Sequence, residues 1–232
     1  MKIFLKYFWI VFINIILILY LSELLVTIFL APAVNMQLGL DYLRYEKAKE
    51  IGVNFDIRTD QQAFFEEKKN LPNLSPKYRY NKYLLRYAQI NQFIENKLKK
   101  QQIVPLRGPI NKKTLSCNED GKRKIINNDK NGFKNPNLIY KKEIKIFLIG
   151  DSFAEGACLD ENNDVAGILR NKFNINTANY GIGGSGPLSS LAVLKEYGTH
   201  LKPDLVVYLY YEGNDMEDLS HENKTFLRKY LN

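Results

Sequence analysis

The strongest constraint on the fold is the alternation of buried-strand and helix patterns that begins at residue 143. The sequence predicts strands at 143–150, 175–181 and 204–213, separated by helices at 165–173 and 187–200. Strands that alternate with helices form parallel sheets with right-handed crossovers, and ligands bind beyond the carboxyl ends of such strands. The pattern therefore predicts an α/β domain over 144–232, with a site at the edge where the strands end.

Three polar clusters follow the predicted strands, namely Gly150-Asp151-Ser152, Asn179-Tyr180-Gly181 and Gly213-Asn214-Asp215. An acyl-transfer site needs a nucleophilic hydroxyl, a base and hydrogen-bond donors for the oxyanion. Ser152 can supply the hydroxyl. The Gly181 N–H and the Asn214 side-chain amide can supply donors from neighbouring strand ends. In this order, the clusters predict a serine-based catalytic site.

The glycines at 181, 183 and 186 also match the dinucleotide-binding fingerprint, after a strand and before a helix. The acidic residue that would hold the ribose is then Asp204. Asp204 precedes its strand and so lies at the wrong end for that contact. Nucleotide binding is therefore disfavoured, and these glycines are expected to let the backbone turn.

Three segments resemble blocks I, II and III of the SGNH, or GDSL, hydrolases. They are GDSFAEG (150–156), NYGIGGSGP (179–187) and YEGND (211–215), in that order. CNEDG (117–121) and DKNGFKNPN (129–137), behind an N-terminal anchor, are similar to the membrane-anchored bacterial subgroup. The resemblance implies a flavodoxin-like α/β/α sandwich. It also implies hydrolysis of acyl esters, often on envelope carbohydrates, without a metal or other cofactor.

The resemblance implies that Ser152 is the nucleophile and that the Ser152 N–H, Gly181 and Asn214 form the oxyanion hole. In the family, the base belongs to an Asp-x-x-His element far downstream of block III. Asp218-Leu-Ser-His221 has these letters, but it follows block III directly, in a predicted helix or lead-in loop at 217–231. Residues 218–221 are therefore expected beside the third predicted strand, away from Ser152. His200 precedes that strand and so lies at the end opposite to the predicted site.

We therefore expect that neither histidine is the base, that the chain is a fragment of a longer protein, and that these 232 residues alone are inactive or nearly so. Three functions remain open: an esterase or deacetylase outside the cytoplasmic membrane, an O-acyltransferase that modifies exopolysaccharide, and a non-catalytic binding module. The acceptor, water or a sugar hydroxyl, separates the first two. A downstream Asp-x-x-His would argue against the third.

Residues 7–31 contain no Lys, Arg or Asp, and their clearly polar residues are Asn14, Ser22, Glu23 and Thr27. About 20 apolar residues suffice to cross a bilayer as a helix. Two lysines precede the run and no basic residue follows until Arg44. The positive-inside rule thus predicts a single-pass anchor over 1–33 with the remaining residues outside the cytoplasm. Glu23 is expected near the outer interface or against a partner, because a charge in mid-membrane is costly.

A cleavable signal peptide is the alternative, because Ala31-Pro32-Ala33 has the small-x-small form of a cleavage site. The apolar region of a signal peptide is usually shorter than this run. The retained anchor is therefore favoured.

Residues 34–143 are interpreted as a membrane-proximal accessory region. The predicted elements are helices at 41–50 and 59–69, a helix or partial loop at 78–100, a β-hairpin at 113–128 turning at Asp120-Gly121, and a loop at 128–137. The net charge is +12 over residues 1–143 and −4 over 144–232. The basic region could bind acidic polysaccharide or anionic lipid, or form an ordinary solvated surface. Nucleic acid is disfavoured by the exported location.

Cys117 and Cys158 are the two cysteines of the chain, and both fall in the predicted exported part, where disulfides persist. We predict that they pair and join the hairpin to the nucleophile segment; two buried thiols are the alternative. We also expect an exposed apolar edge at 204–210, where further strands would pack.

Overall fold

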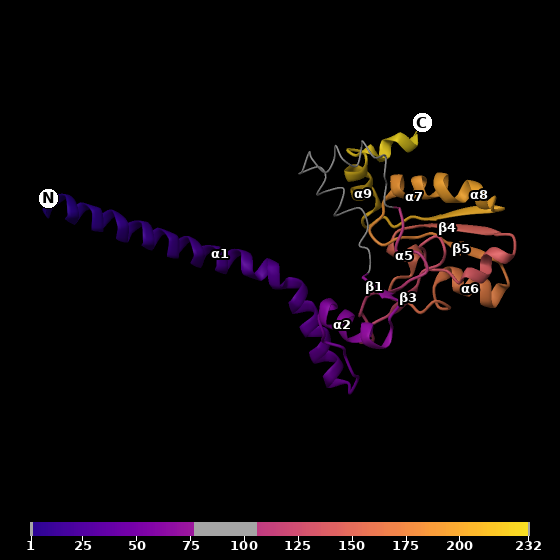
Figure 1. Cartoon of the computed structure of the whole chain (residues 1–232), viewed down its shortest axis with the longest axis horizontal. Helices are drawn as coiled ribbons and strands as arrows, with labels where there is room; N and C mark the ends of the chain where they lie inside the picture. Colours follow the sequence, from indigo (N-terminus) through magenta and orange to yellow (C-terminus); the bar gives the residue numbers. More distant parts are fainter. Residues whose placement is uncertain (1, 77–105, 232) are drawn as a thin grey trace. The chain divides into compact units, whose positions relative to one another are not determined.

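The computed structural model describes residues 2–76 and 106–231, with only the backbone described for 2–6 and 26–41 (Figure 1). The predicted element at 78–100 lies outside the described residues. The chain forms two compact units, Met1–Ile57 and Arg58–Asn232.

The first unit contains one long helix, α1 (Lys2–Glu50). The sequence predicts a membrane helix and a separate helix at 41–50, but the helical backbone continues from one into the other through Pro32. Within α1, the segment Tyr7–Leu25 is long and apolar enough to cross a membrane. The side chains of that segment are exposed in the isolated chain.

The second unit begins with α2 (Asp60–Asn70), which confirms the helix predicted at 59–69. Thr59 caps it, accepting a hydrogen bond from the Gln62 N–H while the Gln62 side chain accepts one from the Thr59 N–H. A small sheet follows, with β1 (Leu74–Ser75) parallel to β2 (Lys113–Leu115) and β3 (Ile125–Asn127) antiparallel to β2.

The predicted hairpin is confirmed as β2 and β3, but its reversal is longer than a two-residue turn. Leu115 pairs with Ile125, so residues 116–124 form the connection. Gly121 in this connection has a φ of +80°, a left-handed conformation that glycine adopts without steric cost. β1 was not predicted, because a two-residue strand carries no periodic signal.

The α/β part contains a parallel sheet in the order β5-β4-β6. Its strands are β4 (Ile146–Gly150), β5 (Thr177–Asn179) and β6 (Leu205–Leu209). The helices that follow them in the chain are α5 (Ser152–Glu155), α6 (Val165–Phe173), α7 (Pro187–Val193), a π-helical turn η2 (Leu194–Gly198), α8 (Thr199–Leu201), α9 (Asp215–Glu222) and the 3₁₀ turn η3 (Phe226–Leu231). The 3₁₀ turn η1 (Asn137–Lys141) precedes β4.

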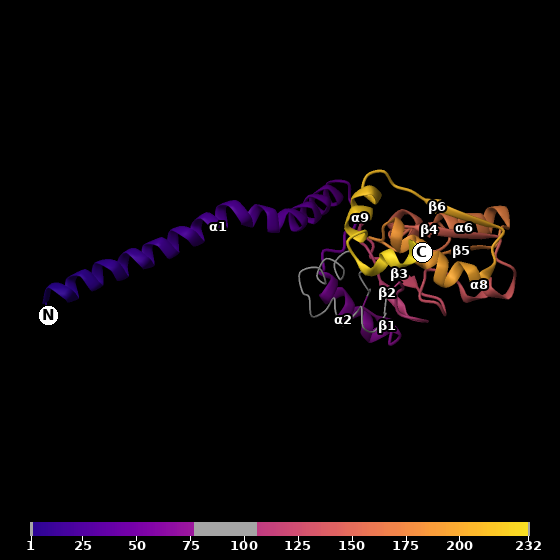
Figure 2. The same cartoon turned by 90° about the horizontal axis from the view of Figure 1, so that it is seen from above.

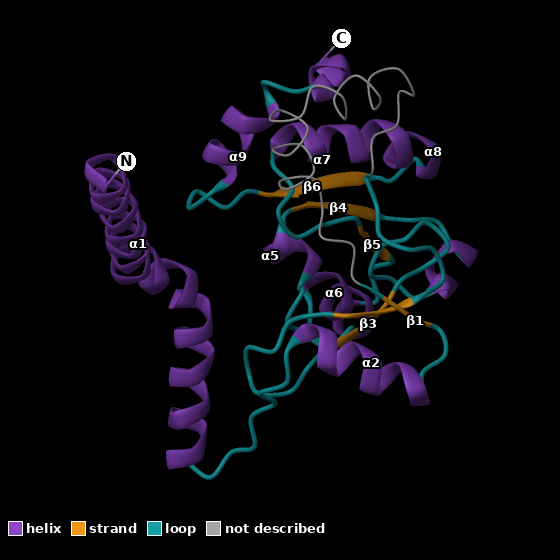
Figure 3. Cartoon of the chain, turned by 60° about the vertical axis from the view of Figure 1, so that its left-hand side comes forward, coloured by secondary structure: helices purple, strands orange, loops and turns teal. Residues whose placement is uncertain are grey.

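Helices cover both faces of this sheet. Phe147 and Ile149 of β4 point into one core with Leu188 of α7, whereas Leu148 points into the other with Ala154 and Ala166. This is the alternation that a strand buried on both faces requires. Figure 3 shows α7 and α8 on one side of the sheet and α5 and α6 on the other. The predicted mixed α/β architecture with a parallel sheet is thus confirmed.

β6 forms an exposed edge, as expected. Among the described residues it pairs with β4 and with no other strand, and β4 lies between β6 and β5 (Figure 2). Leu205 and Val206 are 53% and 40% exposed, whereas Phe147 and Leu148 on the neighbouring strand are buried.

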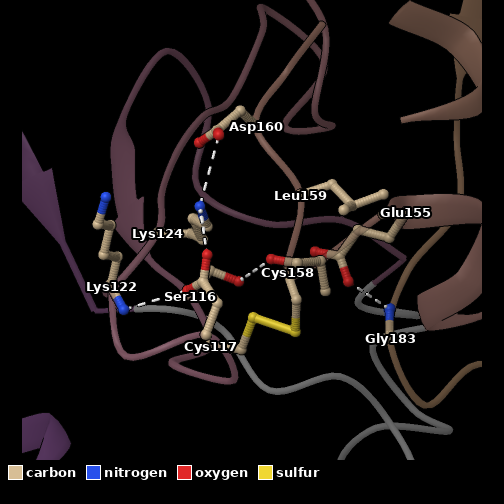
Figure 4. Close-up of a disulfide and its surroundings, with 12 residues drawn as sticks. Ser116, Cys117, Lys122, Lys124, Glu155, Cys158, Leu159, Asp160 and Gly183 are labelled. Atoms are coloured by element: carbon tan, nitrogen blue, oxygen red, sulfur yellow. Dashed lines mark hydrogen bonds and ion pairs between the residues drawn. A yellow bond between two sulfur atoms is a disulfide. The ribbon is translucent and has the colours of Figure 1, made fainter. Parts of the chain in front are cut away.

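A disulfide joins Cys117 and Cys158, with a Cα–Cα distance of 5.3 Å (Figure 4). The predicted pairing is therefore confirmed. Beside it, the Ser116 hydroxyl donates to the Ala157 carbonyl at 2.7 Å. The hairpin is thus fixed to the segment directly after α5, close to the predicted nucleophile.

Replacing both Cys117 and Cys158 with serine should lower the free energy of unfolding by about 2–4 kcal/mol, because the bond closes a long loop in the unfolded chain. Urea unfolding of the purified chain in detergent would measure the loss. Reducing the wild-type protein with dithiothreitol should produce the same shift. Identical unfolding midpoints for the oxidised wild type and the double variant would show that the bond stabilises nothing.

Candidate active site

The three clusters singled out in the sequence lie at one edge of the parallel sheet. β4 pairs with both β5 and β6, with Leu148 opposite Asn179 and Gly150 opposite Leu209. The strands are parallel, so their carboxyl ends face the same way, and the segments after Gly150, Asn179 and Leu209 share that edge. This is the position where open α/β sheets bind ligands.

The backbone at Gly150 permits a sharp turn from β4 into α5. Its φ is +144°, and a Cβ there would lie 2.7 Å from the Leu209 carbonyl oxygen and 2.9 Å from the Ala154 Cβ. The Asp151 carboxylate then caps α5 by accepting from the Phe153 N–H at 2.9 Å. Only glycine fits where the chain passes this close to Leu209 and Ala154. As a result, Ser152 begins a helical turn directly at the sheet edge.

Ser152 is half-buried, and Gly183 of the segment 179–187 lies beside it. A Cβ at Gly183 would stand 3.5 Å from the Ser152 Cβ. The Gly183 N–H donates to Glu155 Oε2 at 2.8 Å, which ties this segment to the end of α5. In the described part of the chain, the Ser152 hydroxyl has no hydrogen-bond partner.

Asn179 and Gly181 are packed against α5. The Asn179 side chain donates to the Ala154 carbonyl at 2.8 Å and accepts from the Gly181 N–H at 2.9 Å. A Cβ on Gly181 would lie 2.4 Å from the Glu155 nitrogen. Gly181 therefore serves close packing, and its N–H is engaged within the protein. The oxyanion role predicted for Gly181 is not supported by this contact.

A different N–H group in the turn between β5 and α7 is available as an oxyanion donor. The engaged pairs are Ile182 with Gly150 O, Gly183 with Glu155 Oε2, Ser185 with Ile182 O, and Gly186 with Glu222 Oε1. The Gly184 N–H has no partner among the residues that the structure describes. Gly184 has a φ of +83° and directly follows Gly183, the neighbour of Ser152. Its N–H is thus the candidate donor that the sequence reasoning missed.

Asn214 lies among buried carboxylates at the end of β6. Its Nδ2 donates to Asp218 Oδ2 at 3.0 Å, and its side chain also hydrogen-bonds with Asp151, the residue before Ser152. Asp215 Oδ2 accepts from the Tyr208 hydroxyl at 2.8 Å and from the Tyr211 N–H at 2.9 Å. These contacts bring block III beside block I and hold the amide in place.

The pKa of the Asp151 carboxyl is raised by its surroundings in this cluster. Burial raises its pKa, and the nearby charges of Asp215 and Asp218 raise it further, whereas hydrogen bonds from the Phe153 N–H and Asn214 lower it. A buried carboxylate surrounded by others needs such donors to remain ionised. The Asn214 amide therefore stabilises the carboxylate of Asp151, the residue that precedes Ser152.

The two histidines of the chain lie on α9 and α8. His221 lies on α9, with its Nε2 3.6 Å from Glu217 Oε1 one turn earlier. His200 is exposed on α8, in the crossover that leads into the amino-terminal end of β6. No hydrogen bond joins Ser152 to either residue in the described structure, consistent with the expectation that neither is the base.

The N-terminus of α7, where a dinucleotide phosphate would bind, is occupied by the protein itself. The buried Glu222 carboxylate accepts from the N–H groups of Gly186, Leu188 and Ser189, at 2.8, 2.9 and 3.3 Å, and from the Ser189 hydroxyl. These are the groups that an anion would use at a helix N-terminus. Burial raises the Glu222 pKa, and the hydrogen bonds from Ser189, Gly186 and Leu188 oppose that rise. The contacts argue against nucleotide binding at this glycine-rich turn.

No protein-family model, curated protein or solved structure matches this chain. The candidate site therefore rests on the geometry of the chain itself.

The loop at 128–137 contacts the candidate site from the accessory region. Its Asn135 side chain pairs with the backbone of Asn179, accepting from the N–H and donating to the carbonyl, both at 2.8 Å. Asp129 holds Asn135 in turn, by accepting from its amide at 3.0 Å. Asn135 thus makes the two backbone hydrogen bonds at the end of β5 that a neighbouring strand would otherwise make.

Lys134 of the same loop reaches the segment after α5. Its Nζ donates to the carbonyls of Gly156 and Leu159, both at 2.7 Å, and lies 3.0 Å from Asp164 Oδ2. Sequence reasoning found this loop but not these roles. A lysine in a loop rich in asparagine is typical of a solvated surface when only composition is considered.

Proposed function

We propose that the chain contains the nucleophile and oxyanion-binding part of an SGNH-type serine hydrolase that acts on acyl esters. One observation carries the proposal: Ser152 begins a helical turn at the carboxyl edge of the central strand, beside the block II turn, and its hydroxyl has no partner in the described residues. A hydroxyl that is held at a sheet edge and left uncommitted is what a nucleophile requires.

The strand order supports the finer fold assignment. In β5-β4-β6 the first strand along the chain is central, the second lies on one side and the third on the other. A flavodoxin-like sheet has this order at its centre, with its ligand site at the carboxyl ends of these strands. We therefore propose the flavodoxin-like SGNH arrangement for residues 144–232, with residues 1–33 as a single-pass anchor in the cytoplasmic membrane and the rest of the chain outside.

In the proposed reaction, Ser152 Oγ attacks the ester carbonyl carbon and gives its proton to a base. Asp218 accepts one hydrogen of the Asn214 amide and Asp151 accepts from the same side chain, so Asn214 can donate to the oxyanion by exchanging one of these bonds. The N–H groups of Ser152 and Gly184 supply further donors. Collapse of the intermediate breaks the ester C–O bond, and the base returns the proton to the departing oxygen. The alcohol leaves, and water then hydrolyses the acyl-serine that remains.

The substrates proposed are acyl esters of envelope carbohydrates. A sugar hydroxyl in place of water in the second step would make the same site an O-acyltransferase. The absence of a histidine contact to Ser152 favours a second candidate, a non-catalytic binding module that keeps the fold. Adding a base to the solution distinguishes a catalytic site that lacks its base from a non-catalytic binding module.

Imidazole should support hydrolysis of a short, unactivated acyl ester by the purified chain, because it can take the Ser152 proton that no histidine of the chain takes. Without imidazole the rate should stay near background. The Ser152→Ala variant corrects for direct attack by imidazole on the ester, and acetate release is the readout.

A wild-type rate that rises with imidazole while the Ser152→Ala rate does not would support the hydrolase. Equal rates in the two proteins at every imidazole concentration would favour the binding module. Full activity without imidazole would show that the chain already holds a base and would make His221 the candidate.

A further inference from the structure

The membrane-length segment of α1 has a polar residue near its middle. Asn14 lies seven residues after Tyr7 and eleven before Leu25, which places it about 10 Å from one end of the segment at 1.5 Å per residue. Its Nδ2 donates to the Ile10 carbonyl at 2.8 Å within the same helix. One N–H and the carbonyl oxygen remain for another partner. In hydrocarbon, water cannot satisfy them, so a protein partner is favoured.

Asn14 belongs to a stripe of residues spaced alternately by four and three along the helix. The stripe consists of Tyr7, Val11, Asn14, Ile18, Leu21 and Leu25, all exposed in the isolated chain. This spacing keeps one face of a helix against a second helix in a left-handed pair. β-Branched Val11 and Ile18 share one heptad position and Leu21 occupies the other, a combination that favours parallel pairs of helices.

A different face of the segment carries three aromatic rings that pack on one another. Phe8, Trp9 and Phe12 pack on one another, with ring centroids 5.8 to 6.2 Å apart, and none belongs to the stripe. Aromatic rings near the end of a membrane helix sit at the lipid interface. The aromatic face is therefore suited to lipid, which leaves the Asn14 stripe for protein.

We infer that two copies of this chain associate in the membrane through the Asn14 stripe. A second copy fits because the asparagine amide is self-complementary: each side chain donates to the oxygen of the other. Copies inserted with the same topology are parallel, so the two Asn14 residues meet at one depth. This inference rests on the proposed membrane anchor and is independent of the ester chemistry.

Cysteine crosslinking in membranes tests the interface, because Cys117 and Cys158 are already paired and leave no free thiol. Under oxidation, Ile18→Cys on the stripe should give a disulfide-linked dimer, and Ile16→Cys on the opposite face should not. Adding Asn14→Leu should weaken dimerisation about three- to tenfold in vesicles, because both interhelical hydrogen bonds of the asparagine pair are lost. Asn14→Gln, which keeps the amide, should retain most of it.

A carbonate wash comes first. If it releases the protein, the anchor is wrong and the dimer falls with it, while the ester hydrolysis assay is unaffected. If the protein stays in the membrane, equal crosslinking at positions 16 and 18, crosslinks to other proteins alone, or an unchanged dimer in Asn14→Leu would overturn the inference.

Discussion

Replacing Lys134 with methionine is expected to lower the free energy of unfolding by about 3–5 kcal/mol, the usual cost of breaking a buried ion pair from one side. The side chains of Lys134 and Asp164 are 2% and 1% exposed, and their charged atoms are 3.0 Å apart. The change would leave the Asp164 carboxylate buried without its cation. It would also remove the donor to the Gly156 and Leu159 carbonyls.

Urea unfolding would measure this loss, and a double variant would show its cause. Lys134→Met combined with Asp164→Asn should recover part of the stability, because the uncompensated charge is gone. Lys145→Met is the matched control: Lys145 pairs with Glu143 and Asp204 on the surface, and its loss should change little. A Lys134→Met protein as stable as the wild type would show that the loop at 128–137 does not secure the candidate site.

The Asn214→Ala substitution is expected to reduce the Ser152-dependent, imidazole-supported turnover about 10²–10³-fold, as loss of one oxyanion donor does. The amide is held beside block I by Asp218 and Asp151, so its removal takes away a donor that is already oriented. The KM should change less than the turnover, because the oxyanion forms only in the transition state.

Asn223→Ala is the control for this substitution. Asn223 follows α9 and is exposed, so it shares the residue type but not the site. It should leave turnover unchanged. If Asn214→Ala retained the wild-type rate and Asn223→Ala behaved identically, the oxyanion role of Asn214 would be wrong.

The secondary structure could be predicted where a periodic pattern was long enough. The helix at 165–173 has the bounds of α6, and the strand at 143–150 contains β4. The predicted helix at 187–200 is interrupted by the π-helical turn η2. Helical periodicity alone does not distinguish an α-helical turn from a π-helical one.

The contacts that build the candidate site could be predicted only in part. The clusters at 150–152 and 213–215 come to one sheet edge because parallel strands end together. Glu222, Asn135 and Lys134 were missed, because each acts through hydrogen bonds to backbone groups 22 to 44 residues away in sequence. Such contacts leave no trace in periodicity or spacing. Gly181 was assigned a free N–H because the competing acceptor, the Asn179 side chain, was not considered.

The most direct test of the central claim is to identify the residue that reacts with a phosphonofluoridate in the presence of imidazole. Attack by Ser152 Oγ forms an O–P bond, expels fluoride and transfers the proton to imidazole. Peptide mass spectrometry should locate the adduct on Ser152, and the Ser152→Ala protein should remain unlabelled. Labelling of another residue, or equal labelling of both proteins, would contradict the assignment of Ser152 as the nucleophile.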